Sequence, residues 1–225
     1  MRRGTCAGLV AAMLALAGCA PGDLDGRLGF GDDAPPLQRI LVTSEHTPAY
    51  QGLLFVAIKD AEAAAQSAGR AVATADNLAE VRSSLGEVVY AVAPEAAPDW
   101  RAKRAGIIPG WAATGYGVRR SVREMADELR ALQGGFGDAP AQALVCAQNT
   151  LRWSEQLLDL VGRAPEVEGT DQLRRLLLQI ADLARALNEG RDVDDDDAIA
   201  VEQGECGLQV VEALLEGVYV RRTAV

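Results

Sequence analysis

Apolar residues recur every three or four positions through most of the chain, and this spacing constrains the fold more than any other feature of the sequence. In residues 78–92, for example, the repeating apolar side chains are Leu78, Val81, Leu85, Val88, Val89 and Val92. Such a period matches one face of an α-helix. No segment alternates apolar and polar residues convincingly, as a half-buried β-strand would. The pattern therefore predicts an all-α fold.

Six segments carry this helical pattern. The first follows Thr47, a candidate N-cap, with Pro48 at the favoured first helical position, and it is rich in alanine as far as Ala73. The others cover residues 78–92, 118–132, 140–162, 170–187 and 208–218. In the fourth, the expected buried stripe is Leu144, Ala147, Leu151, Leu158 and Val161. We expect a bundle of about six helices, formed as one domain by residues 46–225.

The start of the chain has the character of a targeting segment. Arg2 and Arg3 supply positive charge, and an apolar run extends from Ala7 to Ala17. This run is too short to cross a bilayer as a helix, which indicates a signal peptide rather than an anchor.

The residues that follow, Leu16–Cys19 with the sequence LAGC, resemble the lipobox of bacterial lipoproteins. The resemblance implies that residues 1–18 are a lipoprotein signal peptide, that cleavage falls before Cys19, and that Cys19 is diacylated. Ala20 occupies the place of an inner-membrane retention aspartate. The resemblance therefore implies a protein of the cell envelope, attached by lipid to the outer membrane and facing the periplasm. The alternative is an ordinary secretory peptide with an incidental cysteine.

Removal of residues 1–18 leaves 207 residues, enough for one domain with a substantial core. It also takes two arginines and no acidic residue, which changes the net charge from −10 to −12. This charge argues against nucleic acid and anionic membrane surfaces as partners. Gly, Pro and Asp dominate the next stretch, so we expect residues 19–45 to be the lipidated cysteine and a flexible tether.

Two cysteines remain in the mature chain, Cys146 and Cys206. In an oxidising compartment this even pair predicts a disulfide between a late helix and the start of the last one. Two separately buried thiols are the alternative.

One connection, residues 93–117, is long for a compact domain, and such connections are commonly functional. It contains aromatic and basic residues that could form a surface for a ligand or an envelope partner: Trp100, Arg101, Arg104, Trp111 and Tyr116. The alternative is that the aromatic residues cover the end of the bundle.

The stretch from Asn188 to Gly207 places five aspartates between two predicted helices. It resembles the calcium loop of the EF-hand, in which oxygens at positions 1, 3 and 5 and a carbonyl at position 7 surround the ion. With Asp192 at position 1, the resemblance assigns these places to Asp192, Asp194, Asp196 and Ala198. Ile199 supplies the apolar residue at position 8.

The loop departs from that pattern at two places. Position 6 calls for glycine and is Asp197, at which a positive φ has a steric cost. Position 12 calls for a bidentate glutamate and is Gln203; Glu202 or Glu205 would replace it in a shifted register, as in dockerin-like loops. The site predicted on this resemblance is a weak calcium site. The alternative is an acidic connection whose last aspartates cap the following helix.

Catalytic patterns are few. His46 is the only histidine, and no nucleophile elbow, phosphate-binding loop or dinucleotide fingerprint is present. Two hypotheses remain: a lipid-anchored binding or scaffold protein, and a periplasmic enzyme or cofactor carrier with a cavity in the bundle. The second includes a haem held by His46 and Met125.

Overall fold

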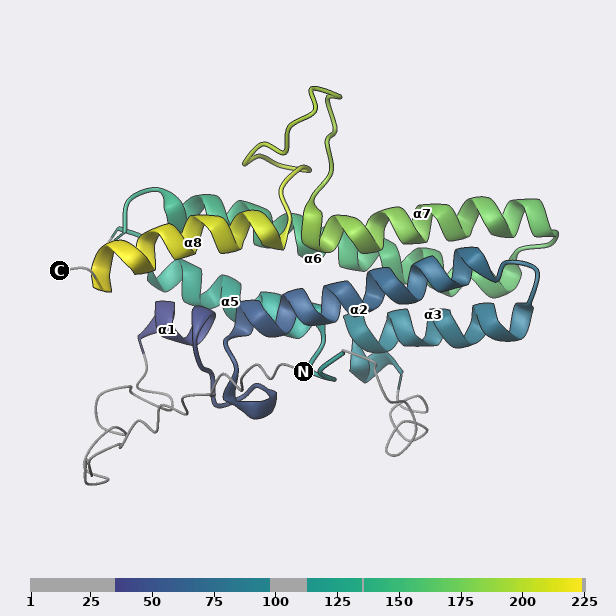
Figure 1. Ribbon diagram of the computed structural model, residues 1–225, viewed down its shortest axis with the longest axis horizontal. Coiled ribbons are helices and arrows are strands. Elements are labelled where there is room, and N and C mark those ends of the chain that lie inside the picture. The colour runs from purple at the N-terminus through teal and green to yellow at the C-terminus, as the bar shows by residue number, and fades with distance from the viewer. Residues whose placement is uncertain (1–34, 98–112, 135, 224–225) are drawn as a thin grey trace, which may run out of the picture.

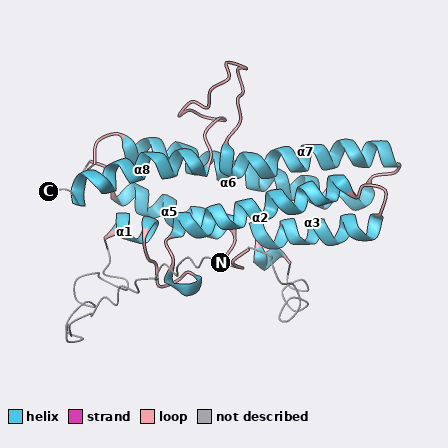
Figure 2. Cartoon of the chain, in the orientation of Figure 1, coloured by secondary structure: helices cyan, strands magenta, loops and turns pink. Residues whose placement is uncertain are grey.

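The structure is a computed structural model that describes residues 35–97, 113–134 and 136–223. These residues form seven α-helices and three short 3₁₀ turns, with a single isolated β-bridge, between Phe136 and Asp138. The helices are α1 (Pro36–Leu41), α2 (Leu53–Ala73), α3 (Leu78–Val92), α5 (Val118–Ala131), α6 (Ala139–Arg163), α7 (Thr170–Glu189) and α8 (Leu208–Thr223). The predicted all-α bundle is confirmed (Figure 2).

The bundle is an elongated rod in which two long helices, α2 and α6, run beside two interrupted ones (Figure 1). Helices α7 and α8 follow each other along one side, and α3 and α5 along another. In one half of the rod α2 packs on α3 and α7, and in the other it packs on α5 and α8. Both interruptions fall near the middle of the rod, which we call its waist.

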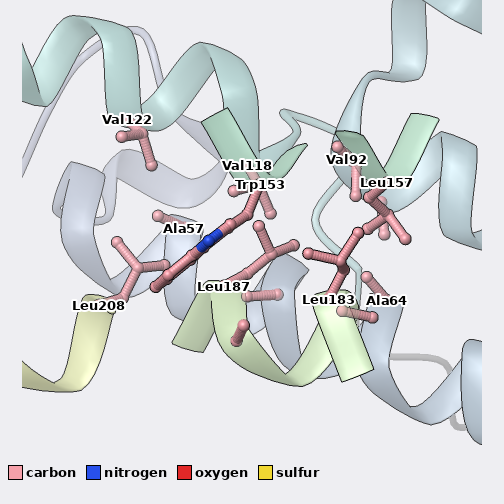
Figure 3. Close-up of a cluster of buried hydrophobic side chains, with 14 of the residues drawn as sticks. Ala57, Ala64, Val92, Val118, Val122, Trp153, Leu157, Leu183, Leu187 and Leu208 are labelled. Atoms are coloured by element: carbon pink, nitrogen blue, oxygen red, sulfur yellow. The ribbon is translucent and has the colours of Figure 1, made fainter. Parts of the chain in front are cut away.

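Alanine allows α2 to pack closely against its neighbours in both halves. Ala57, Ala61, Ala64 and Ala68 are fully buried, and their small side chains let the backbones of adjacent helices approach. At the waist, Trp153 of α6 lies beside Leu187 of α7 and Leu208 of α8 (Figure 3). The core is therefore continuous across the interruption between α7 and α8.

Most predicted helix boundaries are confirmed, but the start of α2 is not. Thr47 and Pro48 resemble a helix start, yet Pro48–Tyr50 forms a 3₁₀ turn with a φ of 56° at both Ala49 and Tyr50. The Thr47 hydroxyl donates to the carbonyl oxygens of Ser44 and Gln51 instead of capping. The helix begins only after Gly52, where an added Cβ would lie 2.6 Å from the carbonyl carbon of Leu41.

The packed part of the chain also begins earlier than the expected boundary at residue 46. Helix α1 contacts α2, α5 and α8, and buries Leu37 and Ile40 in the core. Arg39 forms a bidentate ion pair with Glu128 of α5. The end of the segment expected as a tether, residues 36–41, is therefore part of the bundle.

Helix α6 buries a different stripe from the one that its leucines indicate. Leu144, Leu151 and Leu158 are only partly buried. The fully enclosed face instead includes Cys146, Asn149, Thr150, Trp153 and Leu157. Polar residues on this face escape a pattern that counts only apolar positions.

Candidate metal centre in the α7–α8 loop

The acidic loop between α7 and α8 projects from the waist of the rod (Figure 1). Its two arms meet at the base, where Gly190 and Gly207 allow a close backbone approach. A Cβ at Gly190 would lie 2.4 Å from the Glu205 carbonyl oxygen, and one at Gly207 would lie 2.7 Å from the Gly190 nitrogen. The Arg191 N–H donates to the Glu205 carbonyl oxygen at 2.7 Å. The base of the loop is thus a narrow neck made largely of backbone.

A buried asparagine and a disulfide fix the returning arm to α6. Asn149 Nδ2 donates to the carbonyl oxygens of Glu202 (2.8 Å) and Cys206 (3.3 Å), and its Oδ1 accepts the Gly204 N–H at 2.9 Å. Cys206 is bonded to Cys146, with a Cα–Cα distance of 4.9 Å. The predicted pairing of the two cysteines is present, and it lies directly behind the loop.

Three carboxylates converge inside the loop. Asp192, Asp194 and Glu205 each offer an oxygen, and these oxygens lie within 4.8 Å of one another. Asp192 and Asp194 come from the outgoing arm and Glu205 from the returning arm. Glu205 is only 2% exposed, and its two oxygens accept the N–H groups of Val193 (3.3 Å) and Ala200 (2.9 Å). A buried carboxylate therefore holds the two arms in register.

The outgoing arm folds around the Asp192 side chain. Asp192 Oδ1 accepts the Asp196 N–H at 3.2 Å, and Oδ2 accepts the Asp197 N–H at 2.9 Å. Asp195 and Asp197 have φ values of 60° and 63°, in the left-handed region that aspartate tolerates better than most residues. Position 6 of the calcium-loop pattern, Asp197, thus has the positive φ expected of a glycine there.

The other predicted ligands do not join this group of carboxylates. Asp196 is outside it, and its Oδ1 accepts the Ala198 N–H at 2.9 Å. Gln203 is exposed, in the turn that precedes Glu205. Glu205, two residues further on, supplies the carboxylate that the pattern requires at position 12. The shifted register is therefore the one in which the carboxylates meet.

The donor set fits a hard divalent cation. Three carboxylates supply oxygen ligands and strong negative charge, and Ca²⁺ takes six to eight oxygens at flexible angles, including backbone carbonyls and water. Zinc favours nitrogen and sulfur ligands, and the described part of the chain brings no histidine or free thiol to the loop.

The second predicted surface lies mostly outside the described residues, which omit Trp100, Arg101, Arg104 and Trp111. Tyr116 is described, and its assignment to an exposed surface is wrong. The residue is 6% exposed, the guanidinium of Arg120 lies 4.3 Å from the ring centroid, and its hydroxyl donates to Glu124. The ring belongs to the core because it closes the bundle where α5 begins.

A buried aspartate that the sequence analysis missed fixes the segment before α5. Asp60 of α2 is fully buried and accepts the Thr114 N–H at 2.5 Å, the Thr114 hydroxyl at 2.8 Å and the Gly117 N–H at 2.8 Å. Burial raises the pKa of Asp60 to about 6, more than these hydrogen bonds lower it. The sequence signal for this burial is a charged residue on the alanine-rich face of the first predicted helix.

The suggested haem ligands do not share a site. The His46 side chain is 57% exposed beside Glu45, whereas Met125 is fully buried in the core. Both axial ligands of one haem must reach the same cavity, so this geometry does not support the pair. Cys19 and the signal segment lie outside the described residues.

No protein-family model, curated protein or solved structure matches this chain. None of the described helices is both long and apolar enough to cross a bilayer.

Proposed function

We propose that this protein is a lipid-anchored binding or scaffold component of a bacterial cell envelope, and that its α7–α8 loop binds calcium. The observation that carries the calcium assignment is the convergence of Asp192, Asp194 and Glu205, whose oxygens lie within 4.8 Å of one another. The membrane assignment rests on the basic start, the short apolar run and Leu16–Cys19.

Calcium would join the two arms of the loop. Asp192 and Asp194 reach the site from the α7 side, and Glu205 reaches it from the α8 side. The cation would offset the repulsion among these carboxylates and hold the projecting loop in one shape. A loop ordered in this way offers envelope partners a defined surface.

Calorimetric titration of Ca²⁺ into chelator-treated protein tests the site. Asp194→Asn is the informative variant because Asp194 is exposed and makes none of the hydrogen bonds that shape the loop. We expect saturable binding at roughly 0.1–1 mM, as in extracellular calcium modules, and a loss of at least about tenfold in affinity in the variant.

Asp195→Asn is the matched control. Asp195 lies next to Asp194, outside the converging group, and asparagine tolerates its φ of 60°. This variant should keep affinity close to that of the native protein. Equal losses in both variants would show that only the general negative charge attracts calcium, and absence of heat at millimolar calcium would refute the site.

The anchor is tested separately by Cys19→Ser. The native chain should incorporate labelled palmitate and fractionate with membranes, whereas the variant should do neither. A native chain without lipid would remove the anchor from the proposal and leave the calcium result unaffected. Fractionation with the outer rather than the inner membrane tests the sorting inferred from Ala20.

A further inference from the structure

An apolar groove lies at the end of the rod furthest from α1. One wall is α3, and the other is the turn in which α6 passes through the 3₁₀ segment Ala164–Glu166 into α7. Its volume is about 280 Å³, just below the roughly 300–1,000 Å³ of drug-sized ligand pockets. The apolar lining includes Val81, Leu85, Val89, Val161, Val167 and Leu173.

The α3 wall is a stripe along one helix face. Arg82, Gly86 and Val89 line the groove at spacings of four and three residues, so they succeed one another along the helix axis. Gly86 lies in the interior of α3, where glycine costs about 1 kcal/mol relative to alanine. The missing side chain keeps the middle of the groove open.

Among the described residues that line this groove, one is charged. Arg82 is exposed, and within the described part of the chain the structure gives it no hydrogen bond or ion pair. Most described arginines form an ion pair with an acidic group, for example Arg70 with Glu87 and Arg174 with Asp76. The groove thus combines an apolar floor with a single cation that is open to a ligand.

We propose that this groove binds a small anionic amphiphile, with its apolar chain along Leu85 and Val89 and its anionic head group on the Arg82 guanidinium. A carboxylate matches the guanidinium in charge and in hydrogen-bond geometry. The small volume suits one short apolar chain. A protein partner would instead need an interface of about 800 Å² on each side.

Calorimetric titration of decanoate into the full-length protein tests the proposal, below the concentration at which decanoate forms micelles. Decyltrimethylammonium, which has an alkyl chain of nearly the same length and the opposite charge, is the ligand control. We expect saturable binding of one decanoate and binding of the cation that is at least about tenfold weaker.

Two variants separate the head-group site from the chain site. Arg82→Gln should weaken decanoate binding by at least about tenfold, the lower end of the range for a hydrogen bond to a charged group. Gly86→Leu should abolish binding by filling the groove, while its better helix propensity keeps α3 folded, which a melting curve checks. Arg123→Gln, an exposed arginine of α5 outside the groove, should leave the affinity unchanged.

Three results would overturn the proposal. One is equal binding of the anion and the cation, and another is decanoate binding that neither Arg82→Gln nor Gly86→Leu alters. The third is a concentration-dependent dimer that Gly86→Leu converts to a monomer, since the groove would then be an interface between two copies. None of these outcomes depends on calcium or on the lipid anchor.

Discussion

At the scale of single residues, the burial of Asp60 makes the free energy of unfolding depend on pH. Its pKa is about 6 in the folded protein, against an ordinary value of 3.8. Between these two values the folded protein retains a proton that the unfolded chain has lost. The free energy of unfolding therefore falls as the pH rises from about 4 to about 6, and above pH 6 the loss is complete.

The variant Asp60→Asn should remove this dependence. Relative to the variant, the native protein should lose up to about 3 kcal/mol of unfolding free energy between pH 4 and pH 7, since each pKa unit corresponds to about 1.4 kcal/mol. Urea unfolding at several pH values measures this difference. Near pH 7 the variant has its own cost of about 1–3 kcal/mol, because its NH₂ group faces the Gly117 N–H.

Asp76→Asn is the control for this measurement, because Asp76 is 81% exposed in the turn between α2 and α3. The difference in unfolding free energy between Asp76→Asn and the native protein should stay nearly constant across the same pH range. A constant difference for Asp60→Asn as well would mean that the Asp60 pKa is not raised.

At the scale of elements, α1 is short but is part of the core. Ile40 is fully buried among α2, α5 and α8, whereas Val42 is 45% exposed just beyond the helix. Ile40→Ala should lower the free energy of unfolding by about 2–5 kcal/mol, because it leaves a cavity. Val42→Ala should change it by less than about 0.5 kcal/mol. If chemical unfolding gave similar losses of free energy for Ile40→Ala and Val42→Ala, the packing of α1 against the core would be contradicted.

Helix periodicity located long helices well and short or strained segments badly. The stripe of α7, from Leu173 to Leu187, is both apolar and buried, so its pattern was sufficient. The residues before α2 contain a proline after a threonine, but the close approach of Gly52 to Leu41 decides where the helix begins. Such a contact joins different parts of the fold, and no local pattern records it.

The difference between a local pattern and a contact with a distant part of the fold also applies to the candidate metal centre. The alternating aspartates, Asp192 and Asp194, are visible in the sequence as candidate ligands on one arm. The choice of Glu205 over Gln203 depends on how the returning arm is held by Asn149 and by the disulfide of Cys206. The sequence therefore predicted the chemistry of the loop, and the packing of α6 determined its register.

At the scale of the whole molecule, the disulfide joins the returning arm of the loop to α6, across a separation of 60 residues. In the chain-entropy account, closing a loop of this length stabilises the fold by about 4 kcal/mol. The double variant Cys146→Ala with Cys206→Ala should lose a stability of this order in urea unfolding. A loss well below this value would contradict the stabilising role of the bridge.

The length of α2 determines how far the groove of Arg82 lies from α1. A helix of 21 residues extends about 30 Å, and α1 packs near its start whereas the groove of Arg82 is lined by α3, which lies beside its second half (Figure 1). The described chain therefore enters the bundle, through α1, at one end of a stiff spacer. A molecule bound in the groove would be presented in the other half of the molecule, away from that entry.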